Sequence, residues 1–333
     1  MSSDVRRIDP GELAGDGAAA AAEAVDLHTD LAGIALPDPI LTASGCFASG
    51  SEIDRFFDVS DLAAVVVKSI TREPRNGLPA PRMAETPSGM LNAIGLQNPG
   101  VDMWIERDLA WLRERGARVV ASIAGKTVAD YRHVARALRA ADPDGATIVG
   151  WEINLSCPNV EDRGLVFACS PADSAAVVGA VAEEAPVPTL AKLTSDVTDI
   201  TAIATAVVEA GATGVTLINT LLGMAIDPDT GRPELSNTYG GLSGPAIRPV
   251  AVRNVHQVRQ ALPEVPVLGC GGVRTVTDVV QFLRAGASAV SVGTATFVDP
   301  FVGPRLAGEL RTWLATRGHA DVRSLIGATE PWA

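Results

Sequence analysis

The chain has 333 residues and carries 27 lysines and arginines against 39 aspartates and glutamates, which gives a formal charge of −12 at pH 7. This acidic balance argues against binding to nucleic acid or to an anionic membrane surface. Apolar residues make up 47% of the chain, too many for a disordered protein, yet no apolar run approaches the roughly 20 residues of a membrane-spanning helix.

The first 27 residues combine an alanine-rich tract with Gly, Asp and Ser. They lack the apolar stretch of a signal peptide and the basic character of a transit peptide. We therefore expect residues 1–27 to form a disordered or loosely ordered extension, followed by one large domain over residues 28–320 and a tail over residues 321–333.

From about residue 37 onwards, short β-branched runs alternate with longer amphipathic stretches. Continuous apolar runs are typical of strands buried on both faces of a parallel sheet. Eight such runs cover residues 39–43, 63–68, 118–124, 150–154, 189–193, 214–219, 265–269 and 289–293. Helical patterns cover residues 101–115, 127–140, 170–185, 197–210, 245–262, 275–285 and 303–317. This alternation predicts a (β/α)8 TIM barrel. It disfavours an open doubly wound sheet, because no G-x-G-x-x-G follows the first strand.

Two connections are unusually long. Residues 69–100 are rich in proline and glycine, and residues 220–244 contain the turn-like sequence DPDTGRP. Long and mostly irregular segments in a compact domain usually serve as lids or partner surfaces, and we expect that role here.

Lysine is rare in this chain and is found where a barrel binds its ligand. Only Lys68, Lys126 and Lys192 are present, and all three lie at or just beyond the carboxyl ends of predicted strands. Lys68 and Lys192 follow directly from buried apolar runs, where an unpaired charge is costly, so each is expected to meet an anion. Lys126 begins a loop and can equally well be solvated.

Amides gather at the same end of the predicted barrel. Asn154, Asn159 and Asn219 lie at or just after strand ends, and Asn92 lies in the first long connection. Each one alone is equally well explained by a turn. Together they suit a ligand with amide-like edges, such as a pyrimidine or a flavin ring.

A general base can be sought by elimination. The four histidines fall on outer helices or near the ends of the chain, which leaves Cys157, within NLSCPN, as the clearest proton acceptor. Cys46 and Cys270 are interpreted as inert core thiols. The four cysteines include no C-x-x-C pair, which excludes a self-contained metal or iron–sulfur site and indicates a reduced, cytoplasmic protein.

The last two strands end in glycine-rich segments, CGGV at 270–273 and VGTA at 292–295. Loops after strands seven and eight of such barrels often bind phosphate through backbone N–H groups, which glycine leaves accessible. The two segments therefore predict a cofactor that carries a phosphate.

These residues are similar to those of a known family. The chain resembles the class 1 dihydroorotate dehydrogenases, most closely class 1B, from about residue 31 to 317. The stretches that carry the resemblance are RMAETPSGMLNAIGLQNPGVD (82–102), EINLSCPN (152–159), INTLLGMAID (218–227), GGLSGPAIRPVA (240–251) and GASAVSVGTATFVDPF (286–301). Cys157 distinguishes it from the membrane-bound class 2 enzymes, which have serine there.

The resemblance implies that the 28–320 barrel binds flavin mononucleotide (FMN) and oxidises (S)-dihydroorotate to orotate in the biosynthesis of UMP. The residues at family flavin positions are Ser44, Lys68, Ser69, Asn154, Lys192, Ile218, Gly244, Gly271, Gly272, Gly293 and Thr294. The residues at family substrate positions are Lys68, Asn92, Ala93, Ile94, Gly95, Leu96, Asn154, Asn219 and Thr220.

The resemblance also implies a role for individual residues in the reaction. Cys157 would remove a proton from C5 of dihydroorotate while hydride passes from C6 to flavin N5. Lys192 would stabilise the reduced flavin, and Lys68 would hold the substrate carboxylate. The sequence departs from the usual family pattern at Ser122, where asparagine is common, and at Cys46, where threonine is common.

A class 1B enzyme is a homodimer joined to a second subunit, in a heterotetramer, that carries FAD and a 2Fe–2S cluster and passes electrons to NAD. Two alternatives remain open at this point. One is a stand-alone class 1A enzyme that uses fumarate, and the other is a flavin reductase of the dihydropyrimidine dehydrogenase type, which shares NLSCP but not the LNAIGLQN segment.

Overall fold

A computed structural model describes residues 24–155 and 167–332. Its centre is a sheet of eight strands with the hydrogen-bonded order β3-β14-β13-β10-β9-β8-β7-β4, and every pair within it is parallel. The strands are β3 (Ile40–Thr42), β4 (Val65–Val66), β7 (Val119–Ile123), β8 (Ile148–Asn154), β9 (Thr189–Leu193), β10 (Gly214–Leu217), β13 (Val267–Cys270) and β14 (Ala289–Val292). Each strand coincides with one of the predicted apolar runs, so the (β/α)8 barrel is confirmed.

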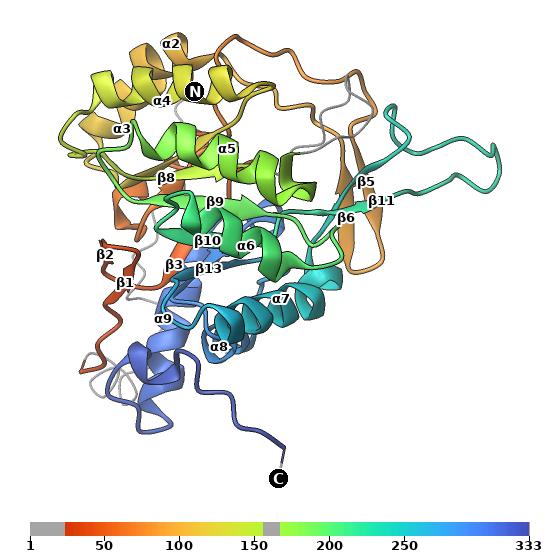
Figure 1. Ribbon diagram of the computed structural model, residues 1–333. Helices are drawn as coiled ribbons and strands as arrows, with labels where there is room; N and C mark the ends of the chain where they lie inside the picture. Colours follow the sequence, from red (N-terminus) through yellow and green to blue (C-terminus); the bar gives the residue numbers. More distant parts are fainter. Residues whose placement is uncertain (1–23, 156–166, 333) are drawn as a thin grey trace, which may run out of the picture.

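Helices surround this sheet (Figure 1). They are α2 (Val101–Met103), the π-helical η3 (Trp104–Leu109), α3 (Ala110–Glu114), α4 (Val128–Ala141), α5 (Pro171–Ala182), α6 (Ile200–Glu209), α7 (Arg248–Ala261), α8 (Val276–Ala285) and α9 (Val302–Ala315). Short 3-10 segments are η2 (Val59–Asp61), η4 (Phe167–Cys169), η5 (Pro245–Ile247), η6 (Thr294–Phe297) and η7 (Val322–Leu325). Threonine caps begin α4 and α8, each with an aspartate three residues later that completes a capping box.

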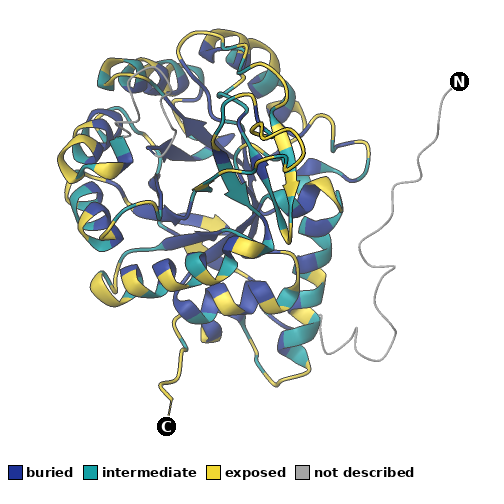
Figure 2. Ribbon diagram, turned by 90° about the vertical axis from the view of Figure 1, so that its right-hand side faces the viewer, coloured by how far each residue is buried: buried dark blue, intermediate teal, exposed yellow. Residues whose placement is uncertain are grey.

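Burial follows the same arrangement. Figure 2 shows the buried strands in the centre of the molecule and the exposed outer faces of the helices around them. The continuous apolar runs are explained by this geometry, since one face of each strand meets the barrel interior and the other meets a helix.

The seam that closes the barrel, between β3 and β4, depends on a side chain. Thr42 Oγ1 accepts a hydrogen bond from Val66 N at 2.8 Å and donates one to Val66 O at 3.3 Å. The backbone adds a bond from Thr42 N to Ala64 O and a bridge between Leu41 and Ala64. Because β4 has only two residues, the Thr42 hydroxyl supplies pairing that the short strand lacks.

A hairpin that the sequence patterns did not predict fills the amino-terminal end of the barrel. It consists of β1 (Thr29–Leu31) and β2 (Ile34–Leu36), which pair antiparallel. Its side chains Leu31, Ile34 and Leu36 are buried in one cluster with apolar residues from the starts of the barrel strands. The hairpin closes the amino-terminal end of the barrel with apolar side chains, so the carboxyl end is the end that is open to a ligand.

The two ends of the described chain meet on the barrel surface. Asp26 N donates to Ala320 O, and Val322 N donates to Asp26 O. Val25 and Leu27 are buried, as is Val322. Residues 24–27, assigned above to the extension, thus pack with the barrel, as does η7 of the expected tail. Residues 1–23 lie outside the described part of the chain, where the loosely ordered extension stays a prediction.

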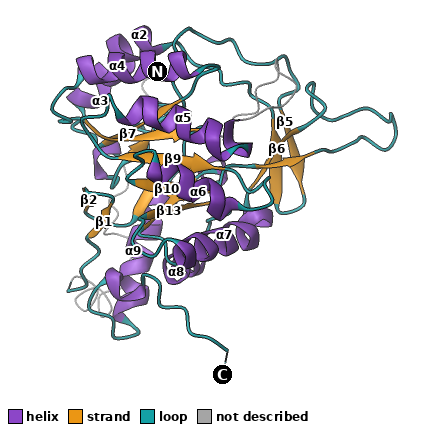
Figure 3. Ribbon diagram, viewed as in Figure 1, coloured by secondary structure: helices purple, strands orange, loops and turns teal. Residues whose placement is uncertain are grey.

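The two long connections contain four short strands that the sequence patterns did not predict. They contribute β5 (Met83–Thr86), β6 (Gly89–Asn92), β11 (Leu221–Gly223) and β12 (Gly240–Ser243), which form an antiparallel sheet in the order β11-β12-β6-β5. We call it the rim sheet, and it projects beyond the barrel (Figures 1 and 3). Most residues of both connections lie outside helices and strands, as expected. The sequence patterns missed the four strands because each has only three or four residues, and because β6 pairs with β12 of the other connection, far away in sequence.

Over residues 24–155 and 167–332, the structure contains no helix with the length and apolarity needed to cross a membrane.

Thr42→Val is expected to lower the free energy of unfolding by about 1–3 kcal/mol, because it leaves the buried Val66 N–H without an acceptor. Thr42→Ser is the matched control, since it keeps the hydroxyl and loses one methyl group, at a cost of about 1 kcal/mol. Urea unfolding of both variants measures the difference. A valine variant no less stable than the serine variant would contradict the role given to this hydroxyl.

Candidate active site

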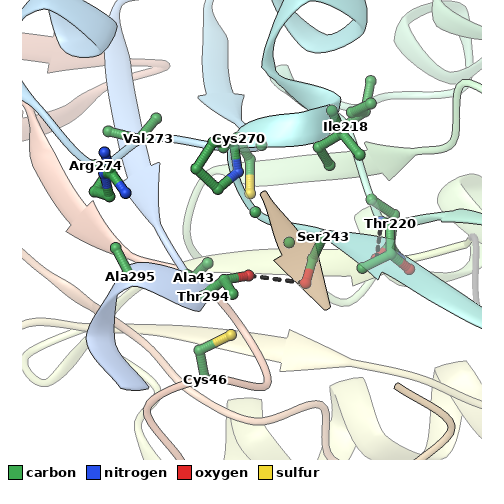
Figure 4. Close-up of a pocket in the computed structure, with 18 of the residues that line it drawn as sticks. Ala43, Cys46, Ile218, Thr220, Ser243, Cys270, Val273, Arg274, Thr294 and Ala295 are labelled. Carbon is green, nitrogen blue, oxygen red and sulfur yellow. Dashed lines mark hydrogen bonds between the residues drawn. The ribbon is translucent and has the colours of Figure 1, made fainter. Parts of the chain in front are cut away.

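A cavity of about 260 Å³ opens at the carboxyl end of the barrel, between the strand ends and the rim sheet. Figure 4 shows Cys46 and Cys270 on its wall, with Ser243 and Thr294 between them in this view. The cavity is lined by Ala43, Ser44, Cys46, Ser88, Gly89, Lys192, Ile218, Asn219, Thr220, Ser243, Gly244, Pro245, Ile247, Cys270, Gly271, Gly272, Val273, Arg274, Gly293, Thr294, Ala295 and Val298.

Lys192, on β9, reaches the cavity from a buried position. The residue is 3% exposed, and its Nζ lies 3.4 Å from Oε1 of Glu152, which is 1% exposed. Nζ also donates a hydrogen bond of 2.9 Å to Ser44 Oγ. Burial is the largest single effect and acts to lower the pKa of Lys192. The pKa is nevertheless raised, because the attraction and hydrogen bond of Glu152, with smaller electrostatic contributions from Cys270 and Cys46, together outweigh burial. The anion expected for Lys192 is therefore a carboxylate of the same chain.

From Glu152, hydrogen bonds continue through the barrel interior. Ser122 Oγ donates to Glu152 Oε1 at 3.3 Å, and the hydroxyls of Ser122 and Ser69 share a hydrogen bond of 2.9 Å. Asn154 Nδ2 donates to Ser69 Oγ at 3.0 Å, and Asn219 Nδ2 donates to Asn154 Oδ1 at 3.2 Å. We call these side chains the buried polar network: Lys192, Glu152, Ser122, Ser69, Asn154 and Asn219.

The network has two ends on one cavity, since Lys192 and Asn219 both line it. Asn154 is fixed further by its backbone carbonyl, which accepts a hydrogen bond of 2.7 Å from the buried Tyr131 hydroxyl. Buried polar groups that satisfy one another resist rearrangement, because breaking one bond leaves a desolvated group unpaired. The arrangement thus holds one ammonium and two amides in fixed relative positions.

The rim sheet brings the first long connection to the same end. Asn92, on β6, pairs with Gly241 of β12, and its Nδ2 donates to Gly241 O at 3.2 Å. A Cβ atom added at Gly241 would lie 2.2 Å from Thr220 Oγ1, so Thr220 lies directly against β12. Beyond Asn92, the chain turns through Gly95 and Leu96 at positive φ.

Glycines shape the opposite part of the cavity. Gly244, Gly271 and Gly272 all have positive φ, which side-chain-bearing residues rarely adopt. A Cβ atom at Gly272 would lie 2.8 Å from both Gly244 O and Arg248 Cβ. Together with Gly293, these residues leave main-chain atoms as the cavity wall, as a phosphate site requires.

The predicted flavin positions mostly line this cavity. Eight of the eleven are Ser44, Lys192, Ile218, Gly244, Gly271, Gly272, Gly293 and Thr294. Of the other three, Ser69 and Asn154 belong to the buried polar network. Lys68 is partly buried, and its Nζ lies 3.6 Å from where a Cβ atom of Gly45 would be.

The predicted substrate positions divide between two elements. Asn219 and Thr220 line the cavity. Residues 92–96 begin at the last residue of β6 and are not among the residues that line the cavity. Cys157 and Asn159 fall within residues 156–166, outside the described part of the chain. Lys126 is exposed and is not among the cavity residues.

The cysteines interpreted as inert core residues both line the cavity, although Cys270 is also buried. Burial raises the pKa of the Cys46 thiol to about 11 and raises that of Cys270 as well, so both thiols stay protonated near neutral pH. Neither is suited to act as a base. Across residues 24–155 and 167–332, no cluster of three His, Cys, Asp or Glu side chains could hold a metal ion.

Sequence patterns missed Glu152 and Arg274. Glu152 is a single carboxylate inside the apolar run of β8, and such a charge signals a buried partner. Arg274 directly follows the predicted phosphate segment CGGV and lines the cavity.

Comparison with known proteins gives a consistent result. The family model described as dihydroorotate dehydrogenase matches residues 26–314. Proteins named dihydroorotate dehydrogenase B (NAD(+)), catalytic subunit, from Geobacillus kaustophilus and Bacillus caldolyticus are each 48% identical over 301 residues, which cover 90% of this chain and 95% of theirs. The protein of the same name from Bacillus pumilus is 48% identical over 90% of this chain and 96% of its own length.

Proposed function

The chain belongs to the dihydroorotate dehydrogenase family, and from this membership we propose that it oxidises (S)-dihydroorotate to orotate in pyrimidine biosynthesis, as the catalytic subunit of a class 1B enzyme. One structural observation supports this proposal at the level of individual residues. The buried polar network joins Lys192, at a flavin position, to Asn219, at a substrate position, and both ends line one cavity.

The cavity fits FMN, which we propose as the flavin of this flavin-dependent family. The glycine backbones of 271, 272 and 293 would hold the phosphate, with Thr294 beside them. Lys192 would face the electron-rich edge of the ring, where an ammonium stabilises negative charge. Ala43 and Ile218 offer apolar contact to the ring itself.

The substrate is an anion with a pyrimidine ring, and the proposed residues match both features. Lys68 would bind its carboxylate, helped by the segment 92–96. Asn154 and Asn219 would hold the ring amides, and their mutual hydrogen bond fixes their orientation before the ligand arrives. Asn92 and Thr220 would complete the site where β12 brings them near each other.

Dihydroorotate loses a proton from C5 and a hydride from C6, which leaves the double bond of orotate, and the flavin supplies the two-electron acceptor when bound. Cys157 is the proposed base for the C5 proton. It follows Asn154, the last residue of β8, by three positions. The protonated state of Cys46 and Cys270 supports this choice, because neither thiol competes for that role.

For re-oxidation we propose a partner subunit with FAD and a 2Fe–2S cluster that passes the electrons to NAD. The relatives named as NAD(+)-linked catalytic subunits support this assignment.

A homodimer is also proposed, because large apolar side chains on or next to the rim sheet are each more than half exposed: Met83, Leu222, Ile226 and Tyr239. The described cysteines are all unpaired, which is consistent with a reducing compartment such as the cytoplasm.

Anaerobic addition of dihydroorotate to the flavin-loaded protein is expected to bleach the flavin absorbance. Dihydrouracil is expected to leave it largely unchanged, because it lacks the carboxylate that Lys68 would bind. A protein that cannot be loaded with flavin would overturn the proposal, and preferential reduction by dihydrouracil would favour the dihydropyrimidine dehydrogenase type.

Co-expression with a candidate electron-transfer subunit is expected to yield a stable complex that reduces NAD with dihydroorotate as donor. The lone chain is expected to reduce NAD poorly. Rapid turnover of the lone chain with fumarate would instead assign it to class 1A.

Cys157→Ala is expected to slow flavin reduction by dihydroorotate roughly 10²- to 10⁴-fold, since it removes the general base. Cys157→Ser should retain weak activity with its pH profile displaced to higher pH, because a hydroxyl is much less acidic than a thiol. Stopped-flow absorbance measures both rates, and Cys169→Ala, at an exposed cysteine outside the cavity, is the matched control. An alanine variant as fast as that control would refute the role of Cys157.

A further inference from the structure

Glu152 is a buried carboxylate that touches the cavity only through another residue. It is 1% exposed and is not among the residues that line the cavity. Its Oε1 atom nevertheless meets both the Lys192 ammonium, at 3.4 Å, and the Ser122 hydroxyl, at 3.3 Å. One carboxylate oxygen thus connects the proposed flavin side of the site to the rest of the buried polar network.

The position of Lys192 depends on this contact. Nζ has a neutral partner in Ser44 Oγ and an anionic one in Glu152. An ammonium at 3% exposure loses most of its hydration, at a cost of several kcal/mol that a hydroxyl alone does not offset. The neighbouring strands β8 and β9 hold the pair together, with Asn154 in register with Lys192.

We propose that Glu152 is a positioning residue that keeps Lys192 protonated and aimed into the cavity, and that it thereby sets the reduction potential of the bound flavin and the pH range over which that potential is maintained. This inference rests on the proposed function, because it assumes that the cavity holds a flavin. Glu152 acts through Lys192 and not by contact with the ring.

Among the groups of the described residues known to act on Lys192, Glu152 is the main source of negative charge. Cys46, after β3, and Cys270, at the end of β13, both interact with Lys192 electrostatically, but burial raises the pKa of each thiol and keeps it neutral. Lys68, after β4, contributes positive charge to the same region. Neutralising Glu152 therefore removes the strongest attraction that raises the pKa of Lys192, which favours loss of its proton.

The glutamine variant separates this role from a merely structural one. In Glu152→Gln, the amide oxygen can still accept the hydrogen bond from Ser122, so that Ser69 and Asn154 keep their partners. The flavin potential should change while the dissociation constant of orotate stays within about twofold. A structural role for Glu152 would alter orotate binding as well, because the amides would lose their fixed orientation.

The experiment measures the midpoint potential of FMN bound to wild type, Glu152→Gln and the surface control Glu209→Gln at pH values from 6 to 10. Glu209 is exposed at the end of α6. At pH 6 the glutamine variant should favour reduced over oxidised flavin about tenfold or more relative to wild type, because the Lys192 charge is no longer offset. This preference should disappear at high pH through one titration that wild type and the control lack.

Parallel potentials in the variant and wild type across this pH range would overturn the inference. If Glu152→Gln does not fold, Glu152→Asp replaces it: the withdrawn carboxylate should offset the Lys192 charge less, so that the flavin potential at pH 6 lies above the wild-type value. A wild-type potential in the aspartate variant across the whole pH range would also overturn the inference. Failure of wild type to bind FMN or to be reduced by dihydroorotate would count against the proposed function instead.

Discussion

A charged lysine inside a barrel wall requires a counter-charge, and this requirement organises the carboxyl end of the molecule. Lys192 and Glu152 are almost fully buried on adjacent strands and pair there. Pairing alone barely compensates for the lost hydration of two ions, so the additional hydrogen bonds from Ser44 and Ser122 matter. Through Ser122 the same carboxylate reaches the amides that would bind the substrate. The proposed cofactor and substrate halves of the site are thus parts of one hydrogen-bonded structure.

The fold provides the rigidity that this network needs. Five neighbouring strand ends carry its members, and in-register parallel pairing fixes their spacing. The amino-terminal end of the barrel is filled by the apolar hairpin of residues 29–36, and the last seam is closed by the Thr42 hydroxyl. The open end is covered in part by the rim sheet, whose close backbone approach at Gly241 positions Thr220. The buried polar network thereby lies at the open, carboxyl end of the barrel, away from the apolar hairpin.

Local sequence patterns predict the features that depend on local physics. A strand buried on both faces must be a continuous apolar run, and for this reason all eight barrel strands could be located. The rim sheet could not, because β6 (GMLN) and β12 (GGLS) have weak alternation and pair across roughly 150 residues of chain. Lys192 and the glycine-rich strand ends could be identified from their place after buried runs. Glu152 could have been found by the same rule, since a carboxylate within β8 also needs a partner.

A crystal structure with FMN and orotate bound tests the central claim most directly. The account predicts that the flavin lies against Lys192, that Asn154 and Asn219 hydrogen-bond the orotate ring, and that the hydrogen bonds from Lys192 through Glu152, Ser122 and Ser69 to Asn154 remain intact. Orotate bound away from the two amides, or a flavin without contact to Lys192, would contradict it.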